Sequence, residues 1–173
     1  MSVAEIDCLD EGRSGASPER SRLMEYSDDI IGLVKALGNR TDVDPKRIVA
    51  FGMSMGCTLH FWLAAMDERI ASVVHFSCFA DYRTLIELGE HDSHGVYLIV
   101  PGLLNETDAG EMAGLIAPRP QLICVGDADN LTPVLAVDRA WAGVQAAYAI
   151  APGKLELIRE PGVKHQETRR MRE

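Results

Sequence analysis

The stretch that decides the fold of this 173-residue chain reads Arg47-Ile48-Val49-Ala50-Phe51-Gly52-Met53-Ser54-Met55-Gly56. Its first half is short, rich in β-branched and aromatic residues and nearly continuous in hydrophobicity, which is typical of a strand buried on both faces. The second half matches G-x-S-x-G, and apolar residues typical of a helix follow as far as Met66. The sequence therefore predicts a buried strand, a sharp turn at Ser54 and a helix in direct succession.

Strand-like and helix-like segments alternate on both sides of this stretch. Before it, apolar residues recur at three- and four-residue steps from 21 to 37, and Gly38 ends the predicted helix. After it, we expect strands at 70–76, 120–125 and 154–159, helices at 82–88, 106–116, 131–148 and 165–172, and an extended segment at 96–100. This alternation predicts an α/β fold, a mostly parallel sheet of about four to five strands with helices on both faces.

Two parts of the chain differ in their patterning. Residues 1–20 combine Asp, Glu, Gly, Ser and Pro without periodicity, which is typical of a flexible amino-terminal segment. Residues 21–173 carry all the predicted strands and helices and are expected to form one domain. Within it, the region at about 77–115 is a polar excursion with weak patterning.

The composition narrows the classes of function. The chain is 47% apolar and 25% charged, as globular domains are, and its net charge of −9 argues against nucleic acid or an anionic membrane as partner. The chain contains no run of 18 apolar residues, so no membrane span is predicted. The four cysteines occur singly, which favours a reducing, cytoplasmic location. No phosphate-cradling glycine loop or dinucleotide fingerprint appears, so no cofactor is expected.

Ser54 is the candidate nucleophile. A serine in a sharp turn between strand and helix has a strained backbone, and the flanking glycines, Gly52 and Gly56, are expected to avoid collisions of a Cβ with neighbouring chain. The turn lifts the hydroxyl above the sheet, and the Met55 N–H at the start of the helix is the candidate oxyanion donor. The alternative is a serine that only caps the helix.

An acid and a histidine follow Ser54 in the chain order that this motif requires. Asp129 comes just after the predicted strand at 120–125, at the edge of the sheet where functional groups of parallel sheets gather. Asp127 is a rival acid at the same edge, with a turn-forming role as its other explanation. His165 lies in a loop after the next strand and is the candidate base.

The other histidines fit catalysis less well. His60 falls within the helix after the nucleophile and His75 near a strand end, where packing with satisfied hydrogen bonds is the expected role. His91 and His94 have H-x-x-H spacing, but no cysteine or carboxylate pattern accompanies them, so a metal site is not expected.

Several further stretches resemble one known superfamily. Residues 43–48 resemble the turn that leads into its nucleophile strand, and 63–70 the stretch behind its serine. Residues 101–104 resemble a segment of its excursion, and 116–120 the entry to its acid strand. Together with the motif at 52–56, they make the chain similar to the carboxyl-terminal part of α/β-hydrolases, in the dienelactone hydrolase and acetyl xylan esterase-like branch.

The resemblance implies a catalytic triad of Ser54, Asp129 and His165 in a partial α/β-hydrolase domain that cleaves carboxylic esters of small molecules through an acyl-enzyme. Peptidase activity is known in the same superfamily and stays open. The histidine stretch, Val163-Lys164-His165, lacks the Gly-Gly-His or Ser-Gly-His form expected of relatives.

The chain also lacks room for the roughly four strands that relatives place before the nucleophile strand, including the loop that donates the second oxyanion N–H. We therefore expect a piece of a longer hydrolase, or a homo-oligomer that pairs through the exposed sheet edge. A catalytically impaired remnant or interaction module is the alternative from another class.

Overall fold

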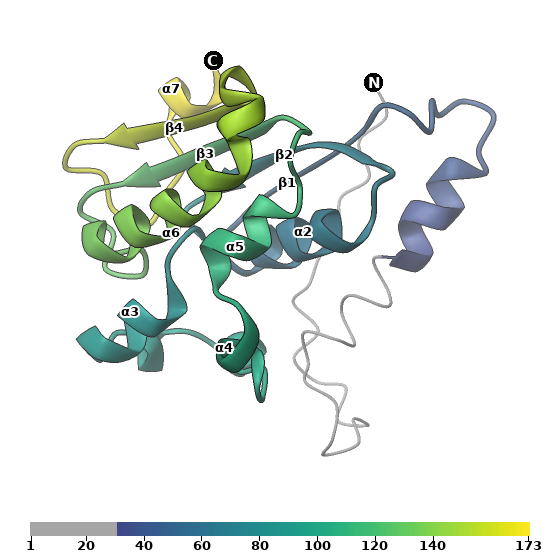
Figure 1. The fold of residues 1–173 in the computed structure, drawn as a ribbon. Coiled ribbons are helices and arrows are strands. Elements are labelled where there is room, and N and C mark those ends of the chain that lie inside the picture. The colour runs from purple at the N-terminus through teal and green to yellow at the C-terminus, as the bar shows by residue number, and fades with distance from the viewer. Residues whose placement is uncertain (1–30) are drawn as a thin grey trace.

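The computed structural model describes residues 31–173, which form a four-stranded parallel sheet with helices on both faces (Figure 1). The strands are β1 (Ile48–Met53), β2 (Ile70–Phe76), β3 (Gln121–Gly126) and β4 (Leu155–Glu160), and they lie in the order β1-β2-β3-β4. The predicted fold class is confirmed. The segment 1–20 and the start of the helix expected at 21–37 lie outside the described residues, and residues 31–38 are helical.

The helices follow the strands as the sequence predicts, with differences in the excursion and at the end. They are α2 (Ser54–Met66), α3 (Tyr82–Leu88), α4 (Leu103–Glu106), α5 (Ala109–Gly114), α6 (Val134–Ala147) and α7 (Arg169–Arg172), with single 3-10 turns at His91–Ser93, Val96–Leu98, Tyr148–Ile150 and Pro152–Lys154.

Three of the predicted segments differ most from the structure. The segment 96–100 is not extended, because its backbone bonds locally from the Leu98 N–H to the Gly95 carbonyl. The helix expected at 106–116 is two helices, because Asp108 forms a capping box with Glu111 and starts α5 anew. The last helix begins only at Arg169. His165 therefore lies in a loop.

The register of the sheet brings the carboxyl ends of all four strands to within two residues of one another. Met53 of β1 pairs with Phe76 of β2, which pairs with Cys124 of β3, which pairs with Ile158 of β4. Since the strands are parallel, the loops that follow them leave at one edge of the sheet. This edge carries Ser54 and the loops after β3 and β4.

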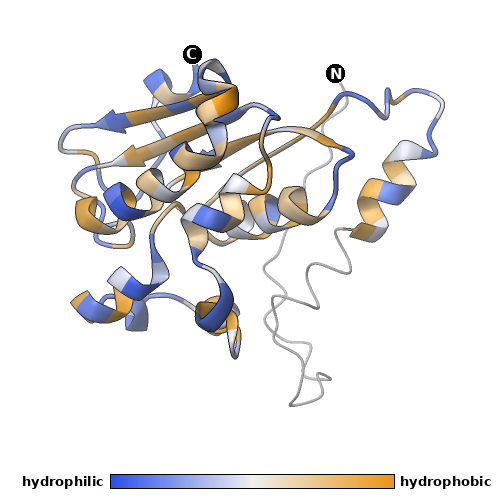
Figure 2. Cartoon of the chain, in the orientation of Figure 1, coloured by the Kyte–Doolittle hydropathy of each residue, from blue (hydrophilic) through white to orange (hydrophobic). Residues whose placement is uncertain are grey.

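The two faces of the sheet are covered unequally. Helices α2, α5 and α6 pack on one face and enclose the main core, which includes Val73 and Ile123 of the strands and the fully buried Phe61 of α2. On the other face, Met171 of α7 packs on a smaller cluster with Phe76. Figure 2 shows the strands as mainly hydrophobic and several of the connecting loops as hydrophilic.

Strand β1 presents apolar surface to solvent. Val49 and Phe51 are 51% and 53% exposed, on the same side of the strand as Met53, which packs with the smaller cluster. The outer edge of β1 pairs with no strand in the described part of the chain. Among residues 31–173, no helix is long and apolar enough to cross a membrane.

Candidate active site

The turn at Ser54 has the backbone that the motif requires. Ser54 adopts φ 55°, a left-handed conformation that costs an L-residue free energy and persists only where the surroundings impose it. Strand β1 ends at Met53 and α2 begins at Ser54, with no residue between them. The junction therefore turns the chain within one residue, at the carboxyl edge of the sheet.

The two flanking glycines have different roles. A Cβ on Gly52 would lie 2.8 Å from His60 Nδ1 and 2.9 Å from the backbone nitrogen of Cys57, so only glycine allows helix and strand to approach this closely. A Cβ on Gly56 would meet nothing within 4 Å outside its own helix. The expectation that both glycines avoid collisions is thus wrong for Gly56.

The start of α2 leaves backbone donors free near Ser54. Met53 caps the helix without a side-chain hydrogen bond, and the first turn contains no acidic residue. The first N–H groups of a helix have no carbonyl partner within it, and their dipoles favour negative charge. The Met55 N–H is one of these donors.

Asp129 and His165 are in direct contact. His165 Nδ1 lies 2.8 Å from Asp129 Oδ2, and because a carboxylate only accepts hydrogen bonds, the ring nitrogen is the donor. Asp129 is 3% exposed and also accepts from the Leu131 N–H at 2.9 Å and the Thr132 hydroxyl at 3.1 Å. The contact leaves His165 Nε2 free to exchange a proton.

These contacts keep Asp129 ionised. Burial by itself raises the pKa of the Asp129 carboxyl, but the hydrogen bonds from His165, Leu131 and Thr132 and the charge of His165 outweigh it. The net result is a pKa below the ordinary value for aspartate. A buried carboxylate of this kind fixes the orientation of an imidazole and favours its protonated form.

Asp127, the rival acid, is used differently. It is exposed, and its Oδ1 accepts a hydrogen bond of 2.5 Å from the backbone N–H of Gly162, which has φ 72°. Asp127 thus holds the turn after β4, and it makes no hydrogen bond to His165 among the described residues. This is the turn-forming role that the sequence offered as its alternative.

Gly126 lets the histidine loop close over the end of β3. A Cβ at this position would lie 2.1 Å from the carbonyl oxygen of Val163 and 2.6 Å from its carbon. The same carbonyl accepts the Ala128 N–H at 3.0 Å. The loop therefore rests directly on a glycine, and His165 follows two residues after the point of contact.

Ser54 shares the edge with this pair but is not bonded to it. Within residues 31–173, no hydrogen bond joins the Ser54 hydroxyl to His165. Strand β2 lies between β1, which leads to Ser54, and β3, which leads to Asp129. The structure thus brings the predicted acid and base together and places the predicted nucleophile on the same edge.

A cavity of about 400 Å³ lies in the excursion, and His94 connects it to the acid loop. Its lining is mainly apolar and includes Leu85, Leu98 and Leu103. The His94 Nε2–H donates to the Leu131 carbonyl at 3.1 Å, two residues after Asp129, and burial lowers the pKa of His94. His91 instead pairs with Asp92 at 2.9 Å. These two histidines form no metal-like cluster in the described structure.

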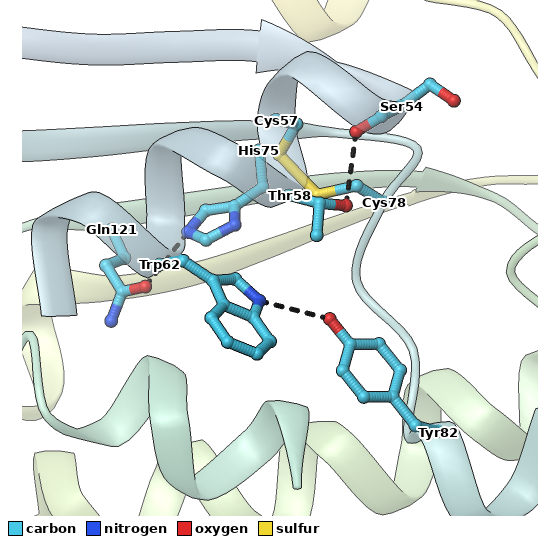
Figure 3. The surroundings of a disulfide bond; sticks show 8 residues. All are labelled: Ser54, Cys57, Thr58, Trp62, His75, Cys78, Tyr82 and Gln121. Atoms are coloured by element: carbon cyan, nitrogen blue, oxygen red, sulfur yellow. Dashed lines mark hydrogen bonds between the residues drawn. A yellow bond between two sulfur atoms is a disulfide. The ribbon is translucent and has the colours of Figure 1, made fainter. Parts of the chain in front are cut away.

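Sequence reasoning missed a cluster behind Ser54, shown in Figure 3. Cys57, in the first turn of α2, is joined by a disulfide to Cys78, just after β2. His75 lies beside them, fully buried, and burial lowers its pKa to about 4. The single, widely spaced cysteines gave no sign of this pairing, because it depends on which strand ends meet in space.

The expectation that His60 and His75 pack with satisfied hydrogen bonds holds only in part. His75 Nε2 bonds Gln121, but His75 Nδ1 and His60 Nδ1 are buried without a hydrogen-bond partner in the structure. An unpaired buried polar atom is uncommon in folded proteins and asks for an explanation.

The fold is that of α/β-hydrolases, and comparison with known proteins finds esterase-like members of that superfamily similar to this chain. The family description "Acetyl xylan esterase (AXE1)" matches residues 24–101. A Bacillus subtilis (strain 168) protein named "Putative hydrolase YtaP" is 40% identical over 121 residues, which are 70% of this chain and 40% of that protein. "Uncharacterized protein YfhR" of Escherichia coli O157:H7 is 28% identical over 160 residues, 89% of this chain and 49% of that protein.

Solved structures show the same fold. A glucuronoyl esterase from Solibacter usitatus superposes with a TM-score of 0.68 at 16% identity, over 91% of this chain and 49% of the esterase. A carbohydrate esterase family 15 glucuronoyl esterase from Caldicellulosiruptor kristjansonii gives 0.65 at 20% identity, over 88% and 50%. The chain thus spans about half the length, or less, of the relatives it matches.

Proposed function

We propose that the chain carries the catalytic residues of a serine ester hydrolase, with Ser54 as nucleophile, His165 as base and Asp129 as acid. The 2.8 Å contact between His165 Nδ1 and Asp129 carries the proposal, because it leaves Nε2 as the free proton acceptor at the edge where Ser54 sits. The left-handed backbone of Ser54 supports it, since this is how a nucleophile elbow exposes a serine hydroxyl.

The reaction follows in two halves. In the first, Ser54 Oγ attacks the ester carbonyl carbon while His165 Nε2 takes the hydroxyl proton, and the protonated imidazole then gives that proton to the departing alcohol. In the second, His165 takes a proton from water, the hydroxide attacks the acyl-Ser54 carbonyl, and Ser54 leaves with the proton to release the acid. Asp129 stabilises the imidazolium in both halves.

The Met55 N–H is the proposed oxyanion donor. It belongs to the first turn of α2, where the helix dipole adds to its attraction for developing negative charge. Loss of one oxyanion donor costs on the order of a hundred- to a thousandfold in rate. The Met55 N–H is therefore expected to contribute a factor of this order to the rate.

The excursion supports a substrate with an apolar group. The cavity of about 400 Å³ has a mainly apolar lining and borders the acid loop through His94. A small neutral ester also agrees with the net charge of −9, which repels anionic substrates such as nucleic acids.

Hydrolysis of a short-chain nitrophenyl ester tests the proposal. We expect activity that Ser54→Ala abolishes and that Ser72→Ala, a half-buried serine within β2, retains. A fluorophosphonate probe should label Ser54 in the wild-type chain. A folded wild-type chain that neither hydrolyses the ester nor reacts with the probe would contradict the proposal and favour an impaired remnant or interaction module.

Cleavage of small peptides is the second activity to test with the same variants. Neither the cavity nor the acid and base distinguishes an ester from an amide. A ratio of kcat/KM values for an ester and an amide with the same acyl group decides between the two.

A further inference from the structure

The cluster behind the nucleophile contains three groups that could bind one metal ion. The sulfurs of Cys57 and Cys78 and a ring nitrogen of His75 all lie within 4.8 Å of one another. Cys57 and His75 are completely buried. Two thiolates and a neutral imidazole are the ligands that thiophilic ions such as Zn²⁺ prefer.

The hydrogen bonds around His75 determine which ring nitrogen faces the sulfurs. Gln121 Nε2 donates to the Ala113 carbonyl at 2.8 Å and to the Tyr148 hydroxyl at 2.7 Å, so the Gln121 amide cannot be turned round. Its Oε1 must then accept a hydrogen bond from His75 Nε2–H at 2.9 Å. The proton is on Nε2, and Nδ1 carries a free lone pair.

The lone pair on Nδ1 has no partner in the disulfide form. Within the described residues, His75 Nδ1 is buried and accepts no hydrogen bond, and in Figure 3 it lies on the side of the ring nearer the sulfurs, while Nε2 faces Gln121. A disulfide offers no proton to it. An N–H fixed by an acceptor and a second nitrogen left bare are what a metal-ligating histidine usually shows.

We propose that the reduced form of this cluster is a metal site, in which Cys57, Cys78 and His75 bind a thiophilic cation of the Zn²⁺ type. Two thiolates balance the charge of Zn²⁺, so the buried site is neutral when occupied. Zinc bonds of roughly 2.3 Å to sulfur and 2.0–2.1 Å to nitrogen require ligand atoms under about 4.6 Å apart, so the three groups are near enough to meet one ion once the disulfide opens and the sulfurs separate. A water molecule completes four-coordination.

The disulfide and the metal exclude each other. A small dithiol reductant opens the Cys57–Cys78 bond, giving two thiols while the reductant becomes a disulfide, so two electrons and two protons pass to the protein. Binding of Zn²⁺ then releases the two thiol protons to solvent. The metal site is thus available only under reducing conditions. The proposal of this site does not rest on the proposed ester hydrolysis.

Titration of the reduced chain with Co²⁺ and then Zn²⁺ tests the proposal. After removal of the reductant without air, we expect one Co²⁺ per chain with a thiolate-to-cobalt charge-transfer band that Zn²⁺ abolishes. Cys57→Ser or Cys78→Ser should lose the band, and His75→Gln should weaken binding by at least about tenfold. Cys124→Ser is the matched control, because Cys124 is a buried free cysteine in the other cluster.

A second measurement needs no variant and so does not depend on folding of the substituted chains. Zn²⁺ should slow alkylation of Cys57 and Cys78 in the reduced wild-type chain, as measured residue by residue by mass spectrometry, and should leave Cys124 unaffected. The proposal is overturned if Zn²⁺ does not change these rates and the reduced chain binds Co²⁺ no better than the double variant Cys57→Ser/Cys78→Ser.

Discussion

Substitution of Gly126 by alanine should displace the histidine loop without touching any reacting group. The new Cβ would lie 2.1 Å from the Val163 carbonyl oxygen, whereas real Cβ contacts are essentially never shorter than 3.0 Å. Both neighbouring atoms belong to the backbone, so no side chain can rotate away. The loop must therefore move by about 0.9 Å at this point.

The movement reaches His165, two residues further along the chain. Its bond to Asp129 is 2.8 Å long, and lengthening by about 0.9 Å exceeds the range in which hydrogen bonds form. Misplacement of a catalytic group by about 1 Å costs on the order of a hundredfold in rate. We therefore expect kcat/KM of Gly126→Ala for a nitrophenyl ester to fall about a hundredfold.

Two readouts and a control make this result decisive. The hydrogen-bonded Nδ1 proton of His165 should give a strongly downfield proton resonance in the wild type and lose it in Gly126→Ala. Gly153→Ala is the matched control, because a Cβ there meets nothing within 4 Å. The reasoning is refuted if Gly126→Ala keeps the downfield proton and remains within about threefold of wild-type activity.

Three further outcomes follow from the site and the sheet. Asp129→Asn should lower kcat by on the order of 10³- to 10⁴-fold while Asp127→Asn costs less than about tenfold, which steady-state kinetics on both variants measures. Because the pKa of Asp129 is lowered on folding, its carboxylate stabilises the folded state at pH values above the ordinary carboxyl pKa, and this stabilisation is lost as the pH falls through the folded-state pKa. The free energy of unfolding measured with urea should therefore depend less on pH in the acid range for Asp129→Asn than for the wild type. Replacing exposed Val49 and Phe51 together with threonine should reduce self-association in analytical ultracentrifugation, and an unchanged apparent mass would remove β1 as the contact surface.

Most of the sheet was predictable because its strands are short and apolar, although the prediction that β1 is buried on both faces is wrong, since Val49 and Phe51 are exposed. The run at 70–76 was predicted with the bounds that the structure gives, and the other strands differ by one or two residues. In a chain where strand-like and helix-like segments alternate, a short continuous apolar run bounded by turns is most simply explained as a strand. The excursion was less predictable, since single helical turns such as Val96–Leu98 are set by local hydrogen bonds and carry no periodicity.

Some features of the candidate site were likewise predictable from the sequence, and others were not. Chain order and strand ends pointed to Asp129 and His165, and the structure joins these two residues. The fit of Gly126 under the histidine loop and the pairing of Cys57 with Cys78 were not visible, because each depends on a contact between segments far apart in sequence. Sequence patterns report burial and turns well, whereas close approach between loops requires the register of the sheet.

That register explains how the four strands carry the proposed catalytic residues on one edge of the sheet. One row of paired residues, from Met53 through Phe76 and Cys124 to Ile158, lies within two residues of all four strand ends, and the helices on the main face pack against the strands. The second face of the sheet differs from this arrangement. The exposed Val49 and Phe51 show that the helices of the described residues leave part of β1 uncovered, so we expect changes on this strand to alter self-association and to leave the contact between Asp129 and His165 in place.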